Sequence, residues 1–334
     1  MRWIIITSCL VCASGCGPAP FPPAGSYSEV TVIADGGLAG EWATTLVAVL
    51  SRRENYFVGT EPRFQVDVIS AERVRDPLQT KTVLLCGVID SGTAVGQRIV
   101  DALDDETAAR ARSGEVNIVR LDDHVLEGQL TVIVTAPTAE RLREVLRVRG
   151  PGLATLVEES CRERLRANLL RDARPDVSDG WERRFGFRLE VPSLYEPYRD
   201  GTGEGGVELH RESPPRVLGV FWTDWPEPPS LEQEGDLFAL RATLVAARYD
   251  GDQMDRDRTR FDTTTLGDYP AVRMSGYWYN ERYSAAGGFY ETYFVWNAKR
   301  KQLWIVDLLV YAPGREKTSL VRELRAVAET FRYR

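Results

Sequence analysis

Apolar and polar residues alternate along the first half of the chain in patterns typical of strands and helices. The continuous apolar run at residues 82–89 predicts a central strand that is covered on both faces. Apolar residues at helical spacing predict a helix over 138–147, and Gly150-Pro151-Gly152 is expected to break it before a second helix runs on to about Asp172. Other strands are predicted at residues 30–34, 64–69, 116–121 and 130–135, and other helices after the turn at 35–37 and at 93–112.

The second half of the chain predicts a sheet, with one helix between two of its strands in the sequence and another helix after the last strand. Strands are predicted at residues 185–192, 217–222, 271–280, 289–297 and 302–311. Ser230 and Gln233 form a capping box before a helix that carries Leu237, Leu240 and Leu244. The last helix has apolar residues at i, i+4, i+7 and i+11, at positions 320, 324, 327 and 331.

The strand at 302–311 is apolar on both faces, so both faces have to be covered. The C-terminal helix is expected to cover one face, and the Leu237 helix or the first domain the other. Together these patterns predict an α+β protein of two domains, each a mixed or antiparallel sheet packed with helices. The expected boundaries are a leader at 1–15, a tether at 16–28, and domains at 29–174 and 175–334.

The N-terminus has the pattern of a lipoprotein signal peptide. Arg2 precedes a short apolar run, and the small residues Ala13-Ser14-Gly15 lead into Cys16, which we expect to be acylated. An ordinary signal peptide or a buried helix is the alternative, since Ala13 stands where Leu is usual. The proline-rich segment Gly17–Gly25 predicts an extended spacer. We therefore expect a protein that is lipid-anchored to the bacterial cell envelope and faces the periplasm, and Gly17 after the cysteine favours the outer membrane.

Charge and composition narrow the classes of partner. The 334-residue chain has a net charge of -7 and no long basic run, which argues against non-specific nucleic-acid binding and against an electrostatic grip on anionic lipid. Apolar residues make up 43% of the chain and charged residues 27%, as in an ordinary globular protein. The lipid anchor is thus the expected membrane contact.

Metal and cofactor chemistry finds little support in the sequence. The mature chain keeps Cys86 and Cys161 besides the lipidated cysteine, and these two are expected either as buried free thiols or as a disulfide. The two histidines, His124 and His210, lie near no Gly-x-Ser-x-Gly turn, and no pair has zinc-ligand spacing. We expect no metal and no cofactor, and the turn at 35–40 lacks the glycine pattern of a nucleotide site.

Two acidic features invite a catalytic or metal interpretation. Asp307 interrupts an apolar strand, so it has to find a partner or shift its pKa; a pairing with an arginine at the sheet edge is the structural alternative to catalysis. The stretch 250–257 is rich in Asp but fails the EF-hand pattern, because Met254 and Asp255 stand where an acid and a glycine are needed. Its interleaved arginines favour a solvated, self-neutralising loop.

Aromatic residues concentrate in the second domain. They are candidate contacts for a sugar ring or a protein partner, because aromatic faces with polar edges give large contact area in the presence of water. Packing between neighbouring strands is the alternative. The candidate binding residues are Trp222, Trp225, Tyr277, Trp278, Tyr279 and Tyr290.

Several short stretches resemble an uncharacterised family of bacterial lipoproteins, domain of unknown function 4837 (DUF4837). The closest is 310–317 with the helix behind it, and further matches lie at 29–35, 61–64, 192–195 and 287–289. The family usually has Met and Pro beside the Gly-Gly pair, where this chain has Ala286 and Phe289. The resemblance implies a lipid-anchored envelope protein and supplies no activity.

The order of elements in the second half is also similar to that of PsbP/Mog1-like domains. These are α/β/α sandwiches with an opening strand, here FGFRLEVP at 185–192, a central helix, a three-strand meander and a closing helix. Members of that fold are mostly binding or assembly modules. The leading hypothesis is therefore a binding or assembly module that contacts an envelope protein or glycan. The rival is an envelope hydrolase that cleaves glycan or peptide with paired carboxylates.

Overall fold

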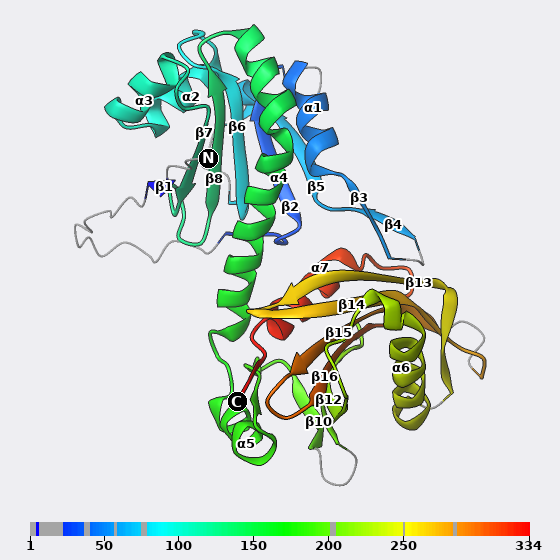
Figure 1. The fold of residues 1–334 in the computed structure, drawn as a ribbon. Helices are drawn as coiled ribbons and strands as arrows, with labels where there is room; N and C mark the ends of the chain where they lie inside the picture. Colours follow the sequence, from blue (N-terminus) through cyan, green and yellow to red (C-terminus); the bar gives the residue numbers. More distant parts are fainter. Residues whose placement is uncertain are drawn as a thin grey trace. The chain divides into compact units, whose positions relative to one another are not determined.

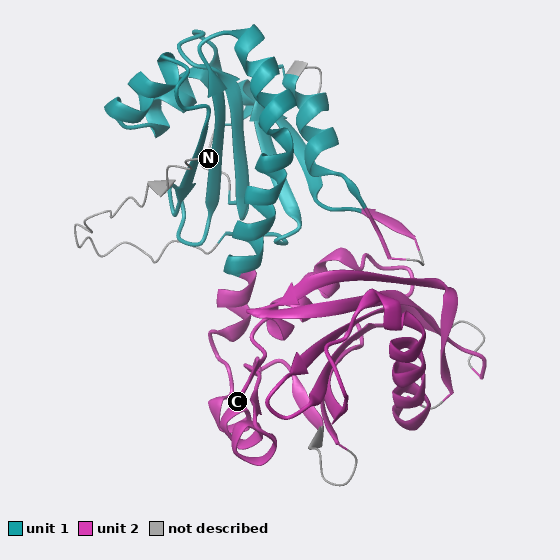
Figure 2. Cartoon of the chain, viewed as in Figure 1, with its two compact units in different colours: residues 1–53, 62–164 teal, residues 54–61, 165–334 magenta. Residues whose placement is uncertain are grey.

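The structure is a computed structural model, and it describes residues 5–6, 23–36, 41–56, 59–74, 79–200, 205–249, 251–282 and 286–334. Cys16, the predicted lipidation residue, lies outside these residues. The chain divides into two compact units (Figure 2): unit 1 is residues 1–53 and 62–164, and unit 2 is residues 54–61 and 165–334. The division at 164/165 falls inside a helix, whereas the sequence predicts a boundary at 174/175.

Unit 1 is built on a six-stranded sheet with the order β1-β7-β8-β6-β2-β5 (Figure 1). Strands β5, β2, β6 and β8 are parallel, and β7 is antiparallel to β8. The strands are β1 (Ile5–Ile6), β2 (Glu29–Ala34), β5 (Gln65–Ser70), β6 (Thr82–Val88), β7 (Ile118–Asp122) and β8 (Leu130–Ala136). Two further strands, β3 (Arg53–Asn55) and β4 (Thr60–Pro62), pair with each other; residues 54–61 of this hairpin belong to unit 2.

Helices cover both faces of this sheet, as the apolar run at 82–89 predicts. Helices α1 (Glu41–Leu50) and α4 (Ala139–Leu170) share one apolar core with β2, β6 and β8. Helices α2 (Ala94–Ala102) and α3 (Asp105–Arg112), with the 3-10 turn η2 (Ala71–Arg73), share a second core on the opposite face. Residues 93–112 are therefore two helices and not the single helix predicted, because Asp104 Oδ1 accepts from Thr107 N at 2.7 Å and starts a new helix.

The predicted helix break at Gly150-Pro151-Gly152 is wrong. Helix α4 continues through Pro151, although proline in a helix interior costs about 3 kcal/mol. Its apolar stripe explains this, because side chains on both sides of the proline are buried in one core, and each Leu or Val contributes roughly 1.5–3 kcal/mol. They are Leu142, Val145, Leu146, Leu153, Ala154 and Val157. Gly150 helps as well, since a Cβ there would lie 3.0 Å from Val49 of α1.

Unit 2 is built on a seven-stranded antiparallel sheet with the order β10-β11-β12-β16-β15-β14-β13. Its strands are β10 (Glu196–Asp200), β11 (Gly206–Arg211), β12 (Arg216–Asp224), β13 (Asp252–Leu266), β14 (Tyr269–Asn280), β15 (Gly287–Asn297) and β16 (Gln302–Val310). A small second sheet pairs β9 (Phe187–Arg188) with β17 (Arg332–Tyr333). The helical elements are α5 (Pro175–Phe185), η3 (Leu231–Gln233), α6 (Glu234–Arg248) and α7 (Thr318–Ala328).

The central strand β16 explains the sandwich. One of its faces packs with α7 and the other with α6, as its two apolar faces predict (Figure 1). Trp304 and Val306 belong to the α7 core, and Leu303 and Ile305 to the α6 core. Unit 2 is thus an α/β/α sandwich, and the α+β fold class is confirmed.

The predicted acidic loop at 250–257 is in fact largely part of β13. This strand lies at the edge of the sheet and pairs with β14, with a shift of register between Met254 and Thr259. Asp255 Oδ1 accepts from Asp257 N and Arg258 N within the bulge. Charged side chains on an edge strand discourage pairing with another chain. No group of acidic, His or Cys residues that could hold a metal is found among the described residues.

Candidate binding site

The six aromatic residues predicted to bind a ligand do not form one exposed surface. Trp278 and Tyr290 are buried in the core below α6, with exposed fractions of 7% and 0%. Trp222 packs against the other core, with its ring 5.5 Å from that of Trp304. The structure therefore favours packing between strands for these residues, and the predicted aromatic binding patch is revised.

The other candidates are half-buried. Trp225 lies at the edge of the α6 core, where its carbonyl accepts from Trp296 Nε1 at 3.5 Å. Tyr277 and Tyr279 stack on each other, with ring centroids 6.3 Å apart. They lie on the opposite side of β14 from Trp278, as strand alternation requires.

Asp307 is paired with an arginine, which is the structural alternative to catalysis. Arg241 of α6 donates from Nε to Oδ1 at 2.8 Å and from Nη2 to Oδ2 at 3.1 Å, and Thr292 Oγ1 donates to Oδ1 at 2.5 Å. Both members of the ion pair are fully buried. The pair lies on the central strand of the sheet and not at its edge, because its partner comes from the covering helix.

A transverse row of the sheet explains how α6 is seated. Glu208, Gly219, Asp307 and Thr292 are successive partners across β11, β12, β16 and β15. Arg241 and Arg248, seven residues apart on α6, face the two carboxylates of this row; Arg248 Nη1 lies 3.9 Å from Glu208 Oε1. Gly219 leaves room between them for the ring of Phe221, which a Cβ would meet at 2.3 Å. The polar groups of this row therefore hold α6 on the sheet.

Two more carboxylates serve α7: Glu291 is buried, and Glu323 is partly buried. Glu291 accepts from Arg325 Nε at 2.8 Å and from Nη2 at 2.6 Å. Burial raises the pKa of Glu291, but the nearby Arg325 and Arg273 outweigh it and hold the pKa below its ordinary value. Glu323 of α7 itself accepts from Arg211 Nη1 at 2.5 Å and from Arg216 Nη2 at 3.0 Å.

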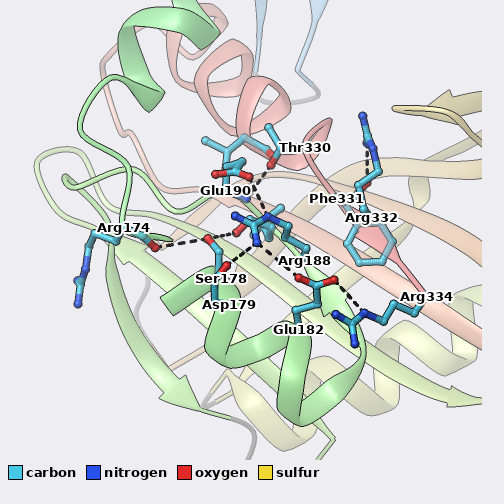
Figure 3. A network of polar contacts seen from close by, with 12 residues as sticks. Arg174, Ser178, Asp179, Glu182, Arg188, Glu190, Thr330, Phe331, Arg332 and Arg334 are labelled. Carbon is cyan, nitrogen blue, oxygen red and sulfur yellow. Dashed lines mark hydrogen bonds and ion pairs between the residues drawn. The ribbon is translucent and has the colours of Figure 1, made fainter. Parts of the chain in front are cut away.

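A surface network fastens the C-terminal strand in the same way (Figure 3). Arg188 of β9 contacts Asp179, Glu182 and Glu190, and Arg334 Nε donates to Glu182 Oε1 at 2.9 Å. Hydrogen bonds to Asp179 and Glu190 raise the pKa of Arg188. These acidic residues connect β17 to β9 and α5, so their role is structural.

A cavity of about 210 Å³ in unit 1 is the candidate site. Its polar lining comes from three segments: Arg98 and Asp101 of α2, Thr131 of β8, and His124 and Gln129 of the 123–129 turn between β7 and β8. Its apolar lining is Ile33, Val74, Val83, Leu85, Ala102 and Val125. Apolar walls with a few polar groups are typical of small-molecule sites.

The geometry of the cavity follows from parallel pairing in the sheet. Val83 is the partner of Thr131, and Leu85 is the partner of Ile33, so these side chains share the face below α2. The C-terminal half of α2 supplies Arg98 and Asp101 at the rim. Partial burial lowers the pKa of His124, which favours its neutral form. The site therefore offers one cation, one carboxylate and one neutral imidazole above an apolar floor.

Some polar groups of the cavity have hydrogen-bond partners within the protein, and one does not. Arg98 Nη2 donates to Val74 O, and Asp101 Oδ1 accepts from Gln97 Nε2 at 2.7 Å. The Thr131 hydroxyl is buried and has no hydrogen-bond partner among the described residues. Buried hydroxyls are normally paired, so this unpaired one is expected to cost stability.

Sequence reasoning missed this site because its residues are far apart in the chain. Arg98 and Asp101 look like ordinary charges on a polar helix, and Thr131 like an ordinary strand residue. Asp35, at the start of the turn considered for a nucleotide, accepts from Val95 N at 3.3 Å and so lies at the start of α2.

Cys86 and Cys161 do not form the alternative disulfide. Both are buried and keep their thiols, as the buried-thiol interpretation predicts. Burial raises the pKa of Cys86 well above its ordinary value, so it is not a reactive thiolate.

Among the helices of the described residues, none is both long and apolar enough to cross a membrane.

A protein-family model matches the second half of the chain. Residues 175–330 match the family described as Domain of unknown function (DUF4837). The match covers unit 2 from the start of α5 to the end of α7, whereas the resemblance was expected from Glu29 onwards. The DUF4837 segment is thus the α/β/α sandwich, and the cavity in unit 1 lies outside it. No curated protein matches the chain.

Solved structures resemble part of the chain weakly. Cyanobacterial PsbP of Synechocystis is 14% identical, covers 45% of this chain and 87% of its own, and gives a TM-score of 0.31. LpqN of Mycobacterium tuberculosis, involved in cell envelope biogenesis, is 14% identical over 43% of this chain and 81% of its own, with a TM-score of 0.30. The Saccharomyces cerevisiae Ran-binding protein Mog1p is 8% identical over 44% of this chain and 90% of its own, at 0.32.

Proposed function

We propose that this protein is a lipid-anchored binding protein of the cell envelope, which holds a small molecule in the cavity of unit 1. The cavity carries the proposal. An engineered apolar cavity of roughly 150 Å³ is enough to bind benzene. A cavity of about 210 Å³ with a polar rim therefore admits a molecule of that size with a polar group attached.

The rival hydrolase has less support. Glycan cleavage needs two carboxyl groups that converge on one site, roughly 5–10 Å apart. Among the described residues that line the cavity, Asp101 is the one acidic side chain. Asp307 and Glu291 each accept two hydrogen bonds from an arginine. Such pairing favours a role for these acids in the fold over acid–base chemistry.

Binding is tested with a neutral probe on the purified full chain. 3-Methylbutan-1-ol is small enough for the cavity and carries no charge, so it tests the space alone. The thermal midpoint should rise with probe concentration in the wild type, because a ligand that binds the folded state stabilises it. Ala102→Phe fills the cavity and should abolish the rise; Ala102→Leu is the milder variant if the first does not fold. A midpoint that no probe concentration moves would rule out the site.

Anchoring is tested separately in cells. An alkyne analogue of palmitate should label the wild-type protein, and Cys16→Ser should remove the label. Cys12→Ser is the matched control, because this cysteine belongs to the predicted leader and labelling should persist. Labelling that survives Cys16→Ser would contradict the proposed anchor.

A further inference from the structure

We infer that the cavity of unit 1 selects a free α-amino acid with an apolar side chain of about leucine size. This inference rests on the proposed function and names the chemical class of its ligand. Three features of the cavity carry it: the paired charges on its rim, the direction of α2, and the apolar floor.

The rim offers one positive and one negative group on a single turn of helix. Arg98 and Asp101 are at i and i+3 of α2, where side chains lie next to each other on the same face. A simple carboxylate would gain from Arg98 but be repelled by Asp101, and a simple amine would meet the reverse. An α-amino acid carries both charges on groups attached to the same carbon, so it satisfies both side chains at once.

The direction of α2 fixes how such a ligand would lie. Asp101 is in the last turn of the helix, whose unpaired carbonyls favour positive charge. The ammonium group is therefore expected beside Asp101, and the carboxylate beside Arg98, one turn earlier. Arg98 is already oriented by its bond to Val74 O, and its guanidinium has further N–H donors for a carboxylate.

The interior of the cavity accounts for the side chain. Ile33, Val83 and Leu85 give an apolar floor, and a cavity of about 210 Å³ limits the ligand to a small molecule. Thr131 also lines the cavity, with its hydroxyl oxygen buried away from the open space.

Calorimetric titration of the full chain with three matched ligands tests this assignment. L-Leucine has both charges, 4-methylpentanoate lacks the ammonium group, and 3-methylbutylamine lacks the carboxylate. Leucine should bind at least about tenfold more tightly than either analogue, which corresponds to roughly 1.4 kcal/mol.

Two variants assign each charge to its partner. Asp101→Asn keeps an oxygen for Gln97, and it should bring leucine and 4-methylpentanoate to similar affinities while leucine still exceeds the amine. Arg98→Gln should do the reverse. Arg110→Gln, on α3 and paired with Glu115, is the control and should change neither ratio.

The outcomes separate the two proposals. Equal affinities for the three ligands, or ratios that neither variant changes, would overturn the selection of an amino acid while the cavity remained a binding site. Failure of these ligands and of the neutral 3-methylbutan-1-ol to bind would overturn both.

Discussion

Arg241 and Asp307 form a two-point ion pair, fully buried between α6 and the central strand of unit 2. Breaking such a pair leaves one charge buried without its partner. Replacing both charges together is much less harmful, because the desolvation of both is removed. The pair therefore fixes the position of α6 on the sheet.

Asp307→Asn should lower the free energy of unfolding by about 3–5 kcal/mol, since Arg241 keeps its buried charge. The double variant Arg241→Met with Asp307→Leu should lose less than either single change. Urea titration followed by tryptophan fluorescence measures this, because the described tryptophans other than Trp42 lie in unit 2. Additive losses in the double variant would contradict the pairing.

Thr131→Val should stabilise the ligand-free protein by about 1 kcal/mol. The change removes a buried hydroxyl that has no partner among the described residues. Thr135→Val is the matched control four residues along the same strand. Its hydroxyl donates to Gly87 O at 2.8 Å, so the same change should destabilise by about 1 kcal/mol. Urea unfolding followed by far-ultraviolet circular dichroism compares the two; equal effects would show that both hydroxyls are satisfied.

Pro151→Ala should stabilise α4 by roughly 1–3 kcal/mol. Alanine restores the amide donor that proline lacks, and the helix already continues through this position. Pro175→Ala is the control, because Pro175 occupies the first turn of α5, where proline is favoured. It should be neutral or slightly destabilising. Hydrogen exchange of the amides in α4 measures the gain, and faster exchange in Pro151→Ala would contradict it.

Glu291 should make unit 2 sensitive to acid. Its folded pKa lies below that of the unfolded chain, near 4.3, so its contribution is present above that pH and is lost as the pH falls through the folded pKa. The stability difference between wild type and Glu291→Gln should thus be large at pH 7 and shrink below about pH 4. Urea titrations at several pH values measure it. Glu115→Gln, at an exposed ion pair, should show little difference at any pH. A gap for Glu291→Gln that is constant with pH would refute this assignment.

The sandwich of unit 2 was predictable because its signals are local. Strand β16 alternates between two apolar faces, and the stripes on α6 and α7 match them. The burial of the aromatic residues was harder to predict from the sequence. Tyr277, Trp278 and Tyr279 alternate along β14, and the sequence does not say which of the two faces α6 covers.

Contacts between residues that are far apart in the chain could not be predicted from the sequence. Arg241 looks like any charge on α6 until β16 brings Asp307 beneath it. In the same way, the cavity joins one turn of α2 to Thr131 and to the turn at 123–129. The register of strand pairing brings the residues of such sites together, and no short stretch of sequence encodes that register.

The most direct test of the binding site is methyl NMR of the full chain during titration with L-leucine. The methyl signals of Ile33, Val83 and Leu85 should move together and saturate, because these side chains form the floor of the cavity. Val306 and Leu308, buried in unit 2, should not move. Shifts confined to unit 2, or none at saturating leucine, would contradict the assignment of the cavity as a binding site for this ligand.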